Sequence, residues 1–240
     1  LVRVPEVEPR LSTNRLLALE WLDGKRLLDY RDRSLEERNR IATAMFTAWW
    51  SPFARYGVIH GDPHLGNYTV FENGAGEAAG INLLDYGCVR IFPAPFVAGV
   101  VDLFHGLRDN DRDRIVSAYE VWGFGGLSNE LIEALNIWAR FIYGPLIDDR
   151  VRTIADGVAP SEYGRREAFQ VHQVLREKGP VTVPREFVFM DRAAVGLGSV
   201  VLHLKAEMIF HRLFAETIEG FDREMLDYRQ KAALGGVGLA

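Results

Sequence analysis

The sequence predicts an α+β fold in which a small number of strands is accompanied by a larger number of helices. Short apolar runs bounded by turn residues occur near the start and again over residues 58–90, which is typical of strands. From Pro95 onward, apolar residues instead recur at three- and four-residue steps, which is typical of helices. Strands followed by a run of helices indicate segregated elements. With 240 residues, the chain can form one large domain or two small ones.

The first thirty residues predict two short strands. Apolar side chains dominate Leu1 to Val7 and Arg15 to Glu20, and turn-prone residues separate the two runs. Leucine and alanine in the second run leave a helix open as an alternative there. Asp23-Gly24 then ends the run. Because the chain does not begin with Met, we expect that its first residue is not the natural start.

A helix is predicted next. Ser34 and Glu37 have the spacing of a capping box, in which the first residue caps the helix and the second lies three positions later. Behind them, apolar residues recur with the period of one helical face. These residues are Ile41, Ala42, Met45, Phe46, Trp49 and Phe53.

The segment from Val58 to Arg90 predicts a β-hairpin. Tyr68 to Phe71 and Ile81 to Leu84 are short strand-like runs, and the residues between them include Asn73-Gly74, a turn signal. We therefore expect two antiparallel strands joined by an exposed loop.

The remaining chain predicts further helices. Three apolar faces follow one another, over residues 96–107, 115–122 and 131–142. Residues 175–180 end another helix with a basic residue, Gly and Pro in the expected order. Phe187 to Phe221 has the pattern of one very long helix, in which Gly196 and Gly198 indicate close packing or a kink.

Composition and charge exclude several classes of protein. The 28 basic and 33 acidic side chains give a net charge of −5, so no overall positive field attracts nucleic acid. A single cysteine, Cys88, excludes a disulfide framework and a zinc site built from cysteines. The most apolar stretch, Ala193 to Leu204, is too short to span a membrane, and residues 1–5 do not form a signal peptide.

The polar residues with the clearest chemical pattern lie in His60-Gly61-Asp62-Pro63-His64-Leu65-Gly66-Asn67 and in Asp85-Tyr86-Gly87. Asp62 and Asn67 are five residues apart in a loop that enters a predicted strand, and Asp85 follows the next strand. Two carboxylates and one amide oxygen are hard ligands suited to Mg²⁺, which usually shares its coordination with phosphate oxygens. Phosphoryl transfer needs such a metal and one carboxylate directed at the acceptor.

These motifs resemble the catalytic half of protein kinases, which have an H-x-D-x-x-x-x-N loop followed by D-F-G. The closer resemblance is to the UbiB family of atypical kinases, also called the AarF or ADCK type, whose loop is similar to H-x-D-P-H-x-G-N. Residues 4–7, 16–24 and 185–192 resemble further segments of that family. The resemblance covers about the first 210 residues and implies a protein-kinase-like fold with a mostly helical C-lobe.

The resemblance also implies roles for the matching residues. Asp62 would orient or deprotonate the attacking group, and His60 would brace the loop. Asn67 and Asp85 would hold Mg²⁺ on the phosphates of ATP. The implied domain boundaries are 1–23 for the last N-lobe strands and the hinge, 24–220 for the C-lobe with its catalytic loop at 58–90, and 221–240 for a C-terminal tail.

In the implied hinge, the backbone of Glu20, Trp21 and Leu22 would hydrogen-bond the adenine edge. Protein kinases also need a lysine on the phosphates, its glutamate partner and a loop over the nucleotide. In this family those parts precede the hinge, whereas Lys25 follows it. The chain therefore looks like the hinge and C-lobe of a larger kinase, and we expect it to be inactive alone.

At the level of function, the resemblance implies an ATP- and Mg²⁺-dependent kinase or ATPase that supports ubiquinone or other isoprenoid-quinone lipid metabolism. The implied partners are ATP and isoprenoid lipids or proteins of lipid biosynthesis, with no nucleic acid. The implied location is the bacterial cytoplasm, with peripheral membrane association of the parent protein. Two alternatives stay open: a small-molecule phosphotransferase of the aminoglycoside or choline kinase type, and a non-catalytic lipid- or protein-binding module switched by nucleotide.

Overall fold

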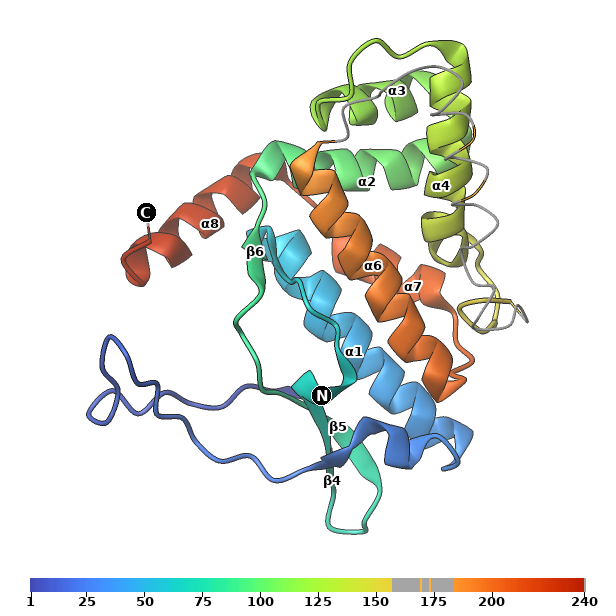
Figure 1. Cartoon of the computed structure of the whole chain (residues 1–240). Helices are drawn as coiled ribbons and strands as arrows, with labels where there is room; N and C mark the ends of the chain where they lie inside the picture. Colours follow the sequence, from blue (N-terminus) through green and yellow to red (C-terminus); the bar gives the residue numbers. More distant parts are fainter. Residues whose placement is uncertain (157–168, 170–172, 174–183, 240) are drawn as a thin grey trace.

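The computed structural model describes residues 1–156, 169, 173 and 184–239. Figure 1 shows two small sheets beside a group of helices, with α1 between the β4–β5 hairpin and the helices α6 and α7. The described helices are α1 (Leu35–Tyr56), α2 (Ala94–Asp109), α3 (Arg112–Val121), α4 (Asn129–Ile147), α6 (Arg185–Leu204), α7 (Phe210–Ile218) and α8 (Arg223–Gly236), with 3-10 turns η1 (Leu27–Tyr30) and η2 (Leu65–Asn67). The predicted end of a helix at residues 175–180 lies outside the described residues.

Helix α1 is the central helix of the core, and it begins as predicted. The Glu37 N–H donates to Ser34 Oγ at 3.2 Å, and the Ser34 hydroxyl donates to Glu37 Oε2 at 3.1 Å. The helix ends at Gly57, whose φ of 65° is in the left-handed region. A Cβ at Gly57 would lie 2.5 Å from the Phe92 carbonyl oxygen, so this end requires glycine. The predicted apolar face is fully buried, with Ile41, Ala42 and Met45 at 0% exposure and Trp49 at 1%.

The larger sheet has the strand order β1-β5-β4-β2. Strands β4 (Tyr68–Glu72) and β5 (Ala78–Leu83) form the predicted antiparallel hairpin, in which Tyr68 pairs with Leu83 and Val70 with Ile81. Strand β1 (Val2–Arg3) adds to β5 in parallel, and β2 (Lys25–Arg26) adds to β4. A second sheet pairs β3 (Val58–His60) with β6 (Val89–Ile91). The two sheets meet at the loop that follows His60.

Residues 4–24 form an extended N-terminal arm that projects from the body of the molecule (Figure 1). Of the two predicted strands, only Val2–Arg3 is regular, and a single antiparallel bridge joins Val7 to Leu19. The arm, which is described throughout, contains no helix, so the helical alternative for residues 15–20 is wrong. The strands are irregular because their apolar side chains cover no core: Leu16 is 60% exposed and Trp21 is 85% exposed.

The predicted single helix over residues 187–221 is wrong, because α6 ends at Leu204 and α7 begins at Phe210. Lys205 adopts φ 48°, which ends α6. The chain between the helices then pairs with a distant segment, since the backbones of Arg152 and Met208 exchange two hydrogen bonds of 3.2 and 3.1 Å. The predicted close packing at Gly196 is confirmed, and its contact is described below.

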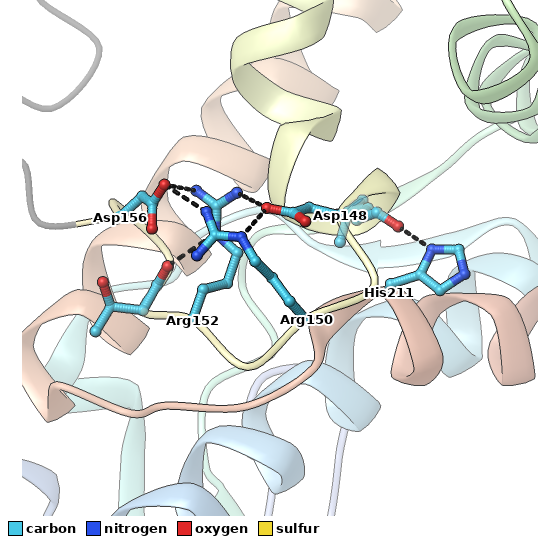
Figure 2. Close-up of polar contacts among 7 residues, drawn as sticks. Asp148, Arg150, Arg152, Asp156 and His211 are labelled. Atoms are coloured by element: carbon cyan, nitrogen blue, oxygen red, sulfur yellow. Dashed lines mark hydrogen bonds and ion pairs between the residues drawn. The ribbon is translucent and has the colours of Figure 1, made fainter.

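Side chains reinforce this crossing of segments. Figure 2 shows the guanidinium groups of Arg150 and Arg152 between the carboxylates of Asp148 and Asp156, and His211 of α7 directed at the end of α4. Arg150 contacts Asp148 at 2.7 Å and Asp156 at 2.6 Å, while Arg152 contacts Asp148 at 2.9 Å. His211 Nδ1 lies 2.7 Å from the Leu146 carbonyl oxygen. The Arg–Asp pairs thus order the loop after α4, while His211 joins the end of α4 to α7 and the Arg212–Asp149 pair, at 3.2 Å, joins the loop to α7.

Residues 221–240, predicted as a tail, instead contain the packed helix α8. Leu226 is buried at 1% exposure, and Gln230 Nε2 donates to the carbonyl oxygens of Tyr56 at 2.6 Å and Phe92 at 2.9 Å. The prediction failed because these partners, the end of α1 and the start of α2, lie more than a hundred residues earlier in the chain.

Among the described helices, α6 is the one that is long and apolar enough to cross a membrane by length and composition alone, with a mean hydropathy of 1.5. Core helices of globular proteins meet the same criterion. Leu197, Val200 and Leu204 of α6 are at most 5% exposed in this fold, where they join the hydrophobic core.

Candidate active site

Two loops converge where the sheets meet, and their backbones are hydrogen-bonded to each other. The first loop runs from Gly61 to Asn67 after β3, and the second runs from Leu84 to Cys88 after β5. The Gly61 N–H donates to the Cys88 carbonyl at 2.8 Å, and the Leu84 N–H donates to the Asn67 carbonyl at 3.0 Å. These two bonds hold the loop of Asp62 beside the loop of Asp85.

His60 forms hydrogen bonds to the backbone of both loops. It is 5% exposed, and its Nε2 lies 2.6 Å from the Asp85 carbonyl oxygen while its Nδ1 accepts the Asp62 N–H at 3.3 Å. A carbonyl can only accept and an N–H can only donate, so both contacts require the neutral ring with its proton on Nε2. This is the geometry that a structural brace needs.

Asp62 and Asn67 contact each other directly. The Asn67 side-chain amide donates to the Asp62 carbonyl oxygen at 3.0 Å and to Asp62 Oδ2 at 3.2 Å. With the amide nitrogen held in this way, the amide oxygen of Asn67 is the atom that can face a cation. Both side chains are half-buried, so a group bound between them is partly shielded from water.

Asp85 lies on the other loop and is exposed. Its Oδ1 accepts the Gly87 N–H at 2.7 Å, which leaves Oδ2 directed away from this turn. Within the part of the chain that the structure describes, no three His, Cys, Asp or Glu side chains gather as a metal site. Two carboxylates with one amide oxygen nevertheless fit Mg²⁺, because that ion completes its shell with water and phosphate oxygens.

Tyr68 is a buried residue close to the carboxylates of Asp62 and Asp85. Burial is the main cause that raises the pKa of the Tyr68 phenol to about 12, and the charges of Asp62 and Asp85 make smaller contributions in the same direction. The Trp49 indole N–H donates to the Tyr68 oxygen at 3.3 Å. The floor of the site is therefore a neutral, buried aromatic layer.

The predicted hinge residues lie at the end of the arm. The Glu20 N–H donates to the Glu6 carbonyl at 2.8 Å, and the Trp21 indole donates to Asp23 Oδ1 at 2.9 Å. These bonds use the Glu20 N–H and the Trp21 side chain, so the Glu20 carbonyl and the backbone groups of Trp21 and Leu22 are the predicted hinge groups that can meet an adenine edge. Lys25, which was not expected to serve the phosphates, pairs with Glu72 at 2.7 Å.

Sequence reasoning missed one hinge residue. Asn82 of β5 is fully buried, and its side-chain amide donates to the Asp23 carbonyl at 3.0 Å and to Thr69 Oγ1 at 2.9 Å. These bonds fasten the end of the hinge to the β4–β5 hairpin. A polar residue inside an apolar strand run was the available signal.

A separate groove lies outside the two loops. It has a volume of about 900 Å³, and α2, α3 and the α7–α8 turn line it, including His105, Arg108, Arg114 and Asp222. None of the predicted site residues lines it. Its acidic and basic side chains are mixed, and Arg114 is already paired with Asp102 at 2.7 Å.

Comparison with known proteins agrees with this geometry. Residues 1–119 match the family model of the ABC1 atypical kinase-like domain. The chain is 30% identical over 116 residues to AarF domain-containing protein kinase 1 of Xenopus laevis, which covers 48% of this chain and 22% of that protein. It is 26% identical over 201 residues to the ABC1 family protein C10F6.14c of Schizosaccharomyces pombe, covering 80% of this chain and 35% of that one.

Two further matches extend the comparison. Protein ACTIVITY OF BC1 COMPLEX KINASE 1, chloroplastic, of Arabidopsis thaliana is 22% identical over 216 residues, covering 87% of this chain and 29% of that protein. The solved structure of Rv3197 from Mycobacterium tuberculosis in complex with erythromycin superposes with a TM-score of 0.64 at 21% identity, covering 92% of this chain and 53% of that one. The predicted α+β, kinase-like fold is therefore confirmed.

The chain spans between 22% and 35% of the length of these three curated relatives. Its match to the ABC1 domain and the names of its relatives nevertheless agree with one another. Through the match of residues 1–119 and the names of its relatives, the comparisons support membership of the chain in the UbiB family of atypical kinase-like proteins.

Proposed function

We propose that the full-length protein containing this chain binds ATP with Mg²⁺ and transfers or hydrolyses its terminal phosphoryl group. The observation that supports this most directly is the contact of Asp62 with Asn67, held beside Asp85 by His60. Two carboxylates and an amide on adjoining rigid loops match the requirements of phosphoryl transfer, which depends on positioning and on neutralising charge.

In this proposal each residue has a separate task. Asn67 and Asp85 hold the cation, which neutralises the phosphates when it is bound. Asp62 faces the attacking hydroxyl or water and accepts its proton as the new bond to the terminal phosphorus forms and the bond from that phosphorus to the bridging oxygen breaks, which releases ADP. His60 keeps its proton on Nε2 and fixes the distance between the two loops.

The proposal extends to the hinge and the cellular role. We propose that backbone groups of Glu20, Trp21 and Leu22 contact the adenine edge. From the resemblance to UbiB kinases, we also propose that the activity supports isoprenoid-quinone lipid metabolism near a membrane. The lysine, glutamate and covering loop that kinases need are not assigned to any residue of this chain. The activity is therefore proposed for the full-length protein.

The test is Mg·ATP turnover by the full-length protein and its Asp62→Asn and Asp85→Asn variants. Each variant keeps the side-chain volume and removes one charge, and we expect turnover to fall by at least about a hundredfold. Asp32→Asn is the matched control, because Asp32 has 83% side-chain exposure and lies outside the two loops. Turnover at the parent rate in both site variants would show that the site is wrongly assigned.

The same assay separates the alternatives. Rapid phosphorylation of a soluble amino alcohol or aminoglycoside would favour the small-molecule phosphotransferase. Nucleotide binding without any turnover would favour the non-catalytic module.

A further inference from the structure

We propose that α6 is the positioning element of the candidate site, because one face of this helix contacts the loop of Asp62 and the strand that follows the loop of Asp85. Gly196 is its closest contact, against Pro63, and Phe189 is its second, against Arg90. The inference concerns positioning residues and rests on the proposed function for its kinetic test.

The first contact lies directly beside Asp62. A Cβ built on Gly196 would lie 2.0 Å from Pro63 Cγ and 3.2 Å from both Cβ and Cδ of the same ring. Ordinary carbon contacts are about 3.5–4.0 Å, so the proline ring rests on the bare helix backbone. Because Pro63 is the residue after Asp62, its contact with α6 fixes the backbone position from which the Asp62 side chain extends.

The second contact lies near the other loop. The Arg90 guanidinium is 4.5 Å from the centroid of the Phe189 ring, which is within cation–π range. Arg90 belongs to β6, where it pairs with Ile59 of β3, and it follows Asp85 by five residues. Arg185 also lies over the Phe189 ring, at 5.4 Å.

The two contacts share one helical face. Positions 189 and 196 are seven residues apart, which is about two turns and roughly 10.5 Å along the axis. Leu197, Val200, Val201 and Leu204 anchor the same helix in the core at 5% exposure or less. The packed helix α6 therefore fixes the distance between the loop of Asp62 and the strand that follows Asp85.

This arrangement predicts that the loop of Pro63, and not α6, moves when a methyl group is added at position 196. A methyl group at position 196 has to increase its separation from Pro63 Cγ by about 1.5–2 Å to reach an ordinary contact distance. The anchored helix resists that movement, whereas the loop of residues 61–67 is only half-buried or exposed and can move. A displacement of about 1 Å can cost about a hundredfold in rate.

The experiment compares Gly196→Ala with Gly144→Ala in the full-length protein. Both glycines are in helices, but a Cβ at Gly144 meets nothing within 4 Å. Alanine is intrinsically the better helix former, so Gly144→Ala measures that effect alone. We expect Gly196→Ala to lower kcat for ATP about tenfold to a hundredfold with KM changed less than about threefold, and Gly144→Ala to leave both unchanged.

Rescue distinguishes positioning from general damage. Pro63→Ala removes the ring atoms that lie closest to position 196, so Gly196→Ala should cost much less kcat in the Pro63→Ala background than in the parent. An equal cost in both backgrounds, or a Gly196→Ala variant with parental kcat, overturns the proposal. If Gly196→Ala alone does not fold, recovery of folding by Pro63→Ala supports the contact and continued misfolding overturns it.

A second readout does not depend on catalysis. Amide hydrogen exchange over residues 61–67 should accelerate in Gly196→Ala and not in Gly144→Ala, while exchange in α1 stays unchanged in both. If the parent shows no ATP turnover, the proposed function fails, and this exchange measurement still decides the positioning role. Unchanged exchange over residues 61–67 would count against it.

Discussion

Glu37 joins the start of α1 to the β4–β5 hairpin, and its removal should destabilise the fold, because it is a buried carboxylate at 9% exposure. Its Oε1 accepts the Ala78 N–H at 3.1 Å, and its Oε2 accepts the Ser34 hydroxyl at 3.1 Å. Ala78 is fully buried, so Glu37→Ala leaves its N–H without an acceptor. A buried unsatisfied donor costs about 1–3 kcal/mol and the lost second bond about 0.5–1.5 kcal/mol, so we expect a total loss of about 2–4 kcal/mol.

The assay is equilibrium unfolding in urea, with Glu36→Ala as the matched control. Glu36 is in the same helical turn, but its side chain is 81% exposed and, among the residues that the structure describes, pairs with Arg40 alone, at 2.8 Å. A pair of this kind contributes at most about 0.5 kcal/mol. The reasoning is refuted if the two alanine variants lose equal stability at an unchanged m-value.

The dependence on pH provides a second check. The Ala78 N–H lowers the pKa of the Glu37 carboxyl in the folded state, and the Ser34 hydroxyl lowers it further. The charged form of Glu37 therefore stabilises the fold fully above the pKa of an unfolded glutamate, about 4.3, and loses this effect as pH falls through the lower folded-state pKa. The stability gap between the parent and Glu37→Gln should narrow over that range.

Two further predictions concern the core and the floor of the site. Phe214 is 1% exposed and meets the rings of Trp50 and Phe104 edge-on at 4.9 Å each, so Phe214→Ala should cost about 3–5 kcal/mol in urea unfolding, and a loss below 1 kcal/mol would contradict the packing. Because burial raises the pKa of Tyr68 to about 12, its neutral form stabilises the fold below the unfolded pKa of about 10 and this effect is lost as pH rises towards 12. Stability measured between pH 9 and 11.5 should therefore fall less steeply in Tyr68→Phe than in the parent, and identical slopes would contradict it.

Local patterns predicted the elements whose determinants are close in sequence. The Ser34–Glu37 spacing located the start of α1, and alternation with a turn located the β4–β5 hairpin. The pattern also indicated close packing at Gly196, although its partner Pro63 is 133 positions away (196 − 63) and could not be named. Short-range signals thus specified where elements begin and not what they touch.

Two of the failures, the single helix over residues 187–221 and the C-terminal tail, involve partners that are distant in the chain. The break between α6 and α7 depends on backbone pairing of Met208 with Arg152, and the packing of α8 depends on Gln230 reaching the end of α1. Neither partner leaves a mark in the local sequence. Apolar periodicity continued through the break, so it indicated one helix.

The candidate site was predictable because its spacing is itself local. Asp62 and Asn67 are five residues apart, and their direct contact follows from the turn η2 between them. Asp85 could be added because the hairpin returns the chain to the same edge. The role of Asn82 at the hinge could not be predicted, because a buried asparagine reveals its partners only in three dimensions.

The exposure of Trp21 has a spectroscopic consequence. Trp49, Trp50 and Trp122 are at most 7% exposed, whereas Trp21 is 85% exposed within the predicted hinge. A quencher dissolved in the solvent therefore reaches the indole of Trp21 while those three core indoles stay protected. The protein carries its own optical reporter at the position where adenine is proposed to bind, so nucleotide binding can be followed by fluorescence without attaching a dye.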